Sequence, residues 1–454
     1  MDKDFHYYLT CTAAMIAGWE KEEAIKIAHS AQFVDDCVPG VLNGTYKHNG
    51  NEYGYISTNC GKFQDIVLNR TARDAILMSY HFLPGNFKCK GEENQSIRQY
   101  LEYNGDKDGP GWTFREKSFK LLCTTKSCLS EKMVNQCSKH KDSWIYYDLI
   151  GICVHVLADT VAHTFFSGES QWSSNEILGD IYRSDHGIDK KILFGDDFEK
   201  RSSSGAGNEN ATYAGHARAD HIPDYPHCNY KYIPQWNKNK KENVVFIDNN
   251  TNYLLAFKLL VQALYCIKND ITFKYGKDYI DHYKFKGRDI IPAINEAITF
   301  DYYLYHNYQK SVNMRCGKFK EILEEAGIDL NGKSDYDPDK IIKDDNAAKS
   351  FNYAALQQLL FVREQLHNND FDVFGEIAGI KEEHVISRIL SDSMKVSEDK
   401  SVPCEKLIDD EVHSNSIQFR LNKDEIAMLK NIDRNIEKFF DFFKNNINSD
   451  NIVG

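Results

Sequence analysis

The residues best suited to chemistry lie in the segment 151–168, GICVHVLADTVAHTFFSG, where His155, Asp159 and His163 follow one another at intervals of four. On an α-helix, steps of four residues keep side chains on one stripe, which turns by about 40° per step. His155 and Asp159 can therefore share one cation, and His163 can serve a second cation beside it. Unpartnered polar groups are costly to bury, and a metal cluster would supply the partners. The alternative is that each side chain is a hydrogen-bonded core residue.

Further histidines and aspartates occur near the ends of apolar segments or as short-range pairs. They are His6, Asp35, Asp36, His81, His216, Asp220, His221 and Asp224. Taken singly, each has a structural interpretation, such as a helix cap for Asp4 or a turn residue for Asp35 and Asp36. Taken together, they form the mixed nitrogen and oxygen set that zinc prefers.

Most of the chain shows helical periodicity, and strand-like alternation is scarce. We expect a mainly α fold, a multi-helix metallohydrolase-like bundle with long irregular loops and extra C-terminal helices. A helical hairpin is predicted over 4–31, broken at Gly18, and the turn-rich segment 39–57 has room for a short hairpin. Other expected helices cover 65–83, 143–166, 251–268, 288–309, 318–326, 346–367 and 422–445, and 202–212 is expected to be a loop.

Two regions are predicted from the distribution of ligands and charges. Every candidate ligand precedes Tyr225, and the chain becomes more charged beyond Lys310. We therefore expect a helical metal-binding catalytic domain over 1–310. The remainder, 311–454, is an accessory helical region or packs on the same core.

Composition narrows the class of protein. The 454 residues are 42% hydrophobic and 27% charged, with a formal net charge of -12. This charge argues against a broad footprint on duplex nucleic acid, although metal ions in a site can still hold a phosphate substrate. The opening residues lack the apolar core of a secretory signal, and no apolar run reaches the ~18 residues of a membrane span. We expect a cytoplasmic protein without stable membrane insertion.

The cysteines are expected to be mostly reduced and buried. There are 12, with irregular spacing and no CxxC pair. Cys123, Cys128, Cys137 and His140 fit the spacing of a zinc knuckle poorly.

The order of the candidate ligands carries a resemblance. Over residues 4–224 the ligands occur in the order early His, Asp, His, H-x3-D-x3-H and H-x3-D. This order resembles that of the zinc-dependent phospholipase C and single-strand nuclease superfamily. The opening DFHYYLTCTAAMIAGW, followed by AHSAQFVDD, also resembles a group of uncharacterised bacterial proteins named only as a domain of unknown function. The superfamily holds three zinc ions in an all-helical fold.

The resemblance implies a ligand set for each ion. The first zinc would be held by Asp35, His81, His155 and Asp159. The second would be held by His163, His216 and Asp220. Asp159 would bridge to a third ion that His6 also binds.

This sequence departs from the superfamily pattern in two places. The superfamily has five residues between its Asp and its second His, whereas three separate Asp159 from His163. The superfamily also uses the amino group and carbonyl of a processed N-terminal Trp. Here Met1 precedes Asp4, so the third ion lacks these ligands unless Asp4 replaces them.

The sequence favours a zinc-dependent phosphoesterase, most readily a phosphodiesterase, with two or three ions, other divalent transition metals being possible. Such ions lower the pKa of a bound water and neutralise a phosphoryl group. Asp35 or Asp36 would orient the water as general base, and Arg218 would reach the substrate phosphate. The expected substrate is a small phosphate ester, a phospholipid head group or single-stranded nucleic acid; protein partners cannot be read from the sequence. The alternatives are an HD-type nucleotide phosphohydrolase and a non-catalytic helical metal-binding interaction protein.

Overall fold

The fold is mainly α, as the sequence predicts. The computed structural model describes residues 1–37, 45–48, 51–54, 58–59, 70–91, 100–103, 112–185, 188–191, 213–237, 243–300, 308–325 and 335–371. The expected loop 202–212 and the expected helix 422–445 lie outside these residues. None of the helices described has the length and apolar character needed to cross a bilayer.

The N-terminal region forms the predicted helical hairpin. A π-helical turn, η1 (Asp4–Leu9), continues into α1 (Thr10–Ile16), and α2 (Lys21–Asp36) runs back along it. Gly18 separates the two helices with a φ of 90°, a left-handed conformation that glycine adopts without strain. A capping box between Glu20 and Glu23 starts α2.

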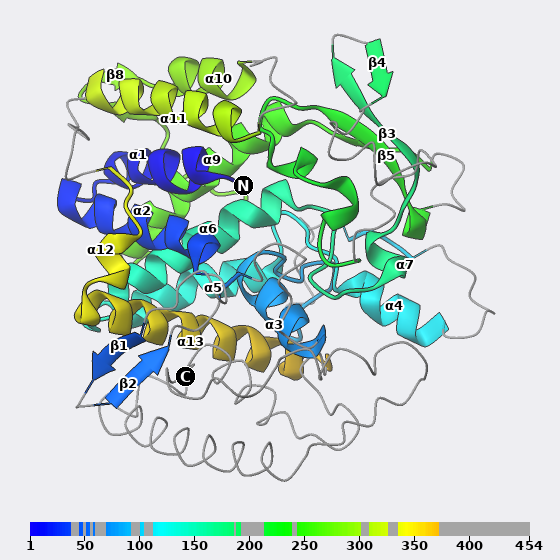
Figure 1. Ribbon diagram of the computed structural model, residues 1–454, viewed down its shortest axis with the longest axis horizontal. Coiled ribbons are helices and arrows are strands. Elements are labelled where there is room, and N and C mark those ends of the chain that lie inside the picture. The colour runs from blue at the N-terminus through cyan, green and yellow to red at the C-terminus, as the bar shows by residue number, and fades with distance from the viewer. Residues whose placement is uncertain are drawn as a thin grey trace.

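Helix α6 (Tyr146–Ala162) is the central element, as Figure 1 shows. Its sequence is apolar on nearly every side, and all of its residues except Tyr147 are buried. It packs against α2 and against α9 (Asn249–Lys268). Gly151 permits the close approach of α2, because a Cβ atom there would lie 2.5 Å from the carbonyl oxygen of Ile27.

Further helices surround this centre. They are α3 (Arg70–Tyr80), α4 (Trp112–Lys120), α5 (Cys128–Cys137), α7 (Trp172–Asn175), α10 (Ile291–Thr299), α11 (Tyr308–Glu325), α12 (Asp339–Ile342) and α13 (Asp345–Asn368). Single 3-10 turns occur at η3 (Ser138–His140), η4 (Ala217–Ala219), η5 (Ile222–Asp224) and η6 (Gln235–Asn237).

A small antiparallel sheet lies beside the helices, which the sequence did not predict. Its strand order is β4-β3-β5-β6, and Figure 1 shows it at the edge of the helical body. Its strands are β3 (Ile177–Asp185), β4 (Ile188–Lys191), β5 (Tyr230–Pro234) and β6 (Val245–Ile247). Two short hairpins pair β1 (Thr45–His48) with β2 (Asn51–Gly54) and β7 (Lys284–Phe285) with β8 (Arg288–Asp289). The first of these falls in the turn-rich segment 39–57.

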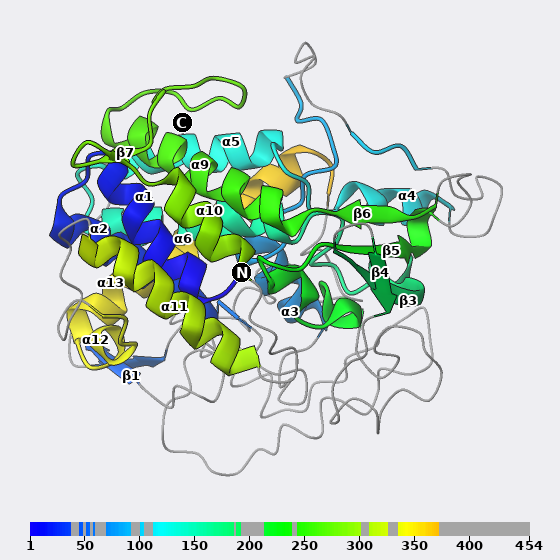
Figure 2. The same ribbon diagram turned by 90° about the horizontal axis from the view of Figure 1, so that it is seen from above.

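The core continues across position 310, where the sequence suggested a boundary. One hydrophobic cluster contains residues from α6 and α9 together with Phe319 of α11 and Phe351 of α13. Helix α11 contacts η1, and α13 contacts α6 and α3. Figure 2 shows α11 lying along the N-terminal helices. The described part of 311–454 therefore packs on the same core.

The cysteines are not all free. Cys89 and Cys128 form a disulfide, which their spacing did not indicate, and this bond excludes the zinc knuckle considered for Cys128. Eight other described cysteines are free and buried. Because disulfides persist mainly in oxidising compartments, the bond lends no support to the cytoplasmic expectation.

Candidate metal centre

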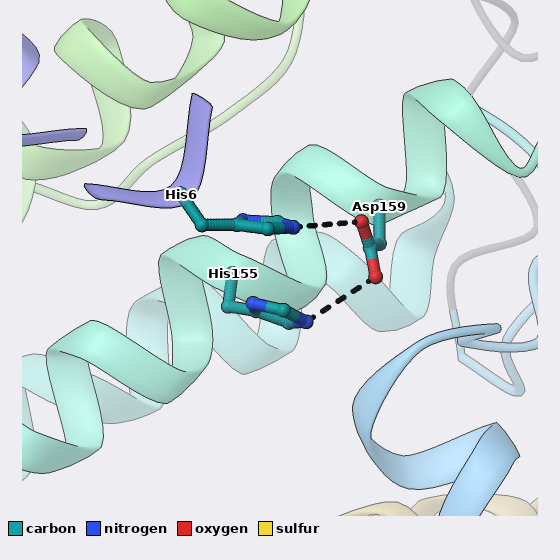
Figure 3. Close-up of side chains that lie close together, drawn as sticks. All are labelled: His6, His155 and Asp159. Atoms are coloured by element: carbon teal, nitrogen blue, oxygen red, sulfur yellow. Dashed lines mark ion pairs between the residues drawn. The ribbon is translucent and has the colours of Figure 1, made fainter. Parts of the chain in front are cut away.

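Helix α6 carries the middle of the candidate centre. His155 and Asp159 lie one turn apart on it and are fully buried. The helix ends at Ala162, so His163 is its C-cap residue. Figure 3 shows the rings of His155 and of His6, which comes from η1, directed at the same Asp159 carboxylate.

The first group of candidate ligands is Asp35, His81 and His155. Asp35 Oδ1, near the end of α2, lies 3.8 Å from His81 Nδ1 and 3.8 Å from His155 Nε2. Asp159 Oδ2 lies 3.2 Å from the same His81 nitrogen and 3.3 Å from the same His155 nitrogen. These four residues are the set expected for the first ion.

The second group is His6, His155 and Asp159. His6 Nε2 lies 3.2 Å from Asp159 Oδ1, and its ring stacks on that of His155 with the centroids 3.8 Å apart. The amino group of Met1 also reaches this point: its nitrogen lies 2.9 Å from Asp159 Oδ1 and 3.1 Å from Asp224 Oδ1.

The third group is His163, His216 and Asp224. His163 Nε2 lies 3.1 Å from Asp224 Oδ1, and His216 Nε2 lies 3.4 Å from Asp224 Oδ2. Asp220, expected as the ligand in this set, belongs to none of the three groups. Its φ is 50°, and its backbone carbonyl accepts a hydrogen bond from His216 Nδ1 at 2.6 Å. Residues 216–224 contain two 3-10 turns in place of an α-helix. Asp224 therefore faces His216, and Asp220 does not.

A backbone carbonyl holds one ring nitrogen in four of the five histidines. His155 Nδ1 donates to Ala31 O at 2.8 Å, and His163 Nδ1 donates to His81 O at 2.9 Å. His81 Nε2 donates to Thr58 O at 2.9 Å, and His216 Nδ1 donates to Asp220 O. Each bond fixes the ring so that its other nitrogen faces the carboxylates. This is the support that metal-binding histidines receive in proteins.

His6 differs from the other four. Among the described residues neither of its buried ring nitrogens has a hydrogen-bond partner. Its Nε2 keeps only the 3.2 Å contact with Asp159 Oδ1, and a cation beside Nε2 would satisfy this buried nitrogen.

The electrostatics suit neutral imidazoles around an ionised Asp159. Burial lowers the pKa of His155 and of His216 to about 4, although nearby carboxylates oppose the shift. Burial would raise the pKa of Asp159, but His163, the Met1 ammonium and the other imidazoles outweigh it and hold this pKa well below its ordinary value. Neutral histidine and ionised carboxylate are the forms that bind metal.

The spacing of the donor atoms also fits metal ions. Within each group, one ligand atom per residue lies within 4.8 Å of the others. Tetrahedral zinc with bonds of ~2.1 Å places its ligand atoms about 3.4 Å apart. The measured separations of 3.1–3.9 Å bracket that value. Each group can therefore hold a metal ion, and the first two groups share the single free nitrogen of His155, Nε2, which binds one ion at a time.

Three other predicted residues are engaged elsewhere. Asp4 accepts a hydrogen bond from the buried Arg315. Asp36 accepts hydrogen bonds from Tyr336 and Gln32. Arg218 is buried and donates twice to one oxygen of Glu176, so a phosphate would have to displace that carboxylate. None of the three predicted residues belongs to a ligand group.

Two contributors were not assigned from the sequence. Asp224 follows His221 in the sequence, but the resemblance assigns the ligand role to Asp220. The Met1 amino group belongs to the main chain, so a pattern of side chains in the sequence does not point to it.

A family model matches residues 1–389, and its description is a family of unknown function, DUF6765. The chain belongs to this family. The match covers every residue of the candidate metal centre. No curated protein and no solved structure matches the chain.

Proposed function

We propose that this member of DUF6765 is a zinc-dependent phosphoesterase, most directly a phosphodiesterase. The observation that carries the proposal is the convergence of five buried or nearly buried imidazoles on three aspartates, with four of the rings braced by backbone carbonyls. When bound, divalent cations would lower the pKa of a water and neutralise a phosphoryl group.

The three aspartates have different surroundings, which suits different roles. The Asp159 side chain is 1% exposed and sits between two ligand groups, which suits a shared ligand. The Asp35 side chain is 22% exposed, the largest fraction among the three aspartates. Burial, with Asp159 and Asp36 nearby, raises the pKa of Asp35 well above its ordinary value against the pull of the Met1 ammonium. The greater exposure of Asp35 suits the orientation of a water molecule as general base.

The substrate class follows from the chemistry of the centre. Phosphate diesters in small molecules, phospholipid head groups and single-stranded nucleic acid share the group that several cations would neutralise. The test is a panel of bis(4-nitrophenyl) phosphate, phospholipid vesicles and single-stranded DNA, with 4-nitrophenyl phosphate as the monoester. We expect hydrolysis of at least one diester, its loss with chelator and its recovery with zinc.

Two variants sharpen the test. Asp35→Asn should lower turnover by about a hundredfold or more if Asp35 acts as general base. His140→Gln is the matched control, because His140 is buried and belongs to none of the ligand groups. A protein that carries its metal but hydrolyses nothing in the panel would instead favour the non-catalytic metal-binding alternative.

The HD-type alternative has less support from the geometry. It needs an adjacent His-Asp pair at the metals. Asp220 and His221 are adjacent, but their side chains are 36% and 50% exposed and neither belongs to a ligand group. Hydrolysis confined to nucleotide monoesters would favour it.

A further inference from the structure

The N-terminal segment reaches the candidate centre, and a buried cation from a distant helix holds it there. Arg315 lies on α11, and its side chain is 0% exposed. Its Nε donates to Asp4 Oδ2 at 2.5 Å, and its Nη2 donates to Asp2 Oδ2 at 3.4 Å. Its Nη1 donates to Ser311 Oγ, one turn earlier on the same helix, at 2.8 Å.

Backbone hydrogen bonds connect the residues that Arg315 binds to the metal centre. The carbonyl of Asp2 accepts hydrogen bonds from the amides of Phe5 and His6, both at 2.9 Å. The aspartates that Arg315 binds therefore flank the turn that presents His6 on one side and the Met1 amino group on the other. Both groups end on the same oxygen, Asp159 Oδ1.

The energetics favour a specific role over general packing. A buried guanidinium between two carboxylates is strongly destabilised when either side is removed, and an apolar side chain of similar volume would pack as well. What the ion pair adds is direction, because the planar guanidinium binds its carboxylates at fixed angles. The ion pairs of Arg315 with Asp2 and Asp4 therefore fix the path of residues 1–6.

The geometry points to Arg315 as a positioning residue for the metal centre, which holds Met1 and His6 against Asp159 through Asp2 and Asp4. Arg315 lies beyond position 310, so the centre depends on a helix from the region that the sequence set apart. This role rests on the proposed function only in that the His6 group binds a metal. The placement of the N-terminal segment can be measured without one.

The test is the reactivity of the Met1 amino group in folded, chelator-treated protein. N-acetoxysuccinimide is the probe, mass spectrometry of the N-terminal peptide is the readout, and Lys343, whose side chain is 73% exposed, is the internal standard. We expect the Met1 amine of the unaltered chain to react at least about tenfold more slowly than Lys343, as a group protected by local structure does. Arg315→Met should remove most of that protection while the near-ultraviolet circular dichroism is kept.

Two further variants make the result decisive. Arg315→Lys keeps a buried cation with a single point of attachment and should give intermediate protection. Arg288→Met is the control, because Arg288 forms an exposed ion pair with Glu325 at the C-terminal end of α11. Zinc content should fall by about one equivalent in Arg315→Met and not in Arg288→Met.

The role would be overturned if the Met1 amine of the unaltered chain reacted as fast as Lys343, or if the amine stayed protected in folded Arg315→Met. It would also be overturned if both Arg315 variants lost the native fold, because Arg315 would then be a residue of global stability. Protection that depends on Arg315 in a chain that binds no zinc would uphold the positioning role and refute the proposed function instead.

Discussion

Replacing Asp159 by Asn removes one charge at the middle of the centre without changing the volume of the side chain. Asp159 Oδ1 contacts the Met1 amine and His6, and Oδ2 lies 3.2–3.3 Å from His81 and His155. Removing one partner of a buried ion pair costs about 3–5 kcal/mol. Met1 keeps its contact with Asp224, so we expect the lower end, about 3 kcal/mol. For a chain of 454 residues that corresponds to a fall in Tm of roughly 3 °C in metal-free protein.

The zinc-bound state gives the sharper assay. Zinc at a hundredfold excess over its Kd stabilises a folded protein by about 2.7 kcal/mol per site. Thermal unfolding of the unaltered chain should shift upward with zinc, and Asp159→Asn should lose most of that shift because Asp159 lies within contact distance of two ligand groups. Asp148→Asn is the control, because Asp148 is a buried carboxylate on the same helix that binds Ser30 and Ser350 and belongs to none of the groups. An unchanged zinc shift in Asp159→Asn would refute the reasoning.

Three further expectations concern the ligand set, pH and chain length. Asp224→Asn should lower the zinc content by about one equivalent and Asp220→Asn should not; the reverse would restore the set expected from the sequence. Burial raises the pKa of Asp148 above 3.8, against the pull of Lys26 and two hydroxyl donors, so its stabilising contribution is present below that value and lost as pH rises through the raised pKa. Urea unfolding from acid to neutral pH should therefore show Asp148→Asn gaining stability relative to the unaltered chain, and a constant difference would contradict this. A chain ending at Gln309 loses α11 and α13 from the core and should be aggregated or partly unfolded by gel filtration and circular dichroism; a compact, zinc-binding fragment would contradict the shared core.

The centre was predictable where the chain is regular. The four-residue spacing of His155, Asp159 and His163 directs them to one side of α6, and that geometry is local. Asp35 and His81 could be included because each ends a segment of clear helical periodicity.

The remainder depends on contacts that spacing does not encode. Asp220 fits a helical pattern, but the segment folds as 3-10 turns with Asp220 at positive φ, which brings Asp224 to His216. The pairing of Arg315 with Asp2 and Asp4 spans more than three hundred residues. The sheet was missed because its strands are short and β3 shifts register between Leu178 and Tyr182, which interrupts the alternation.

The central claim is that the three His/Asp groups hold metal, and elemental analysis of the purified chain tests it most directly. We expect at least two equivalents of a transition metal, chiefly zinc, which chelator removes and added zinc restores. Less than about half an equivalent, with none taken up when zinc is supplied to the folded protein, would contradict the account.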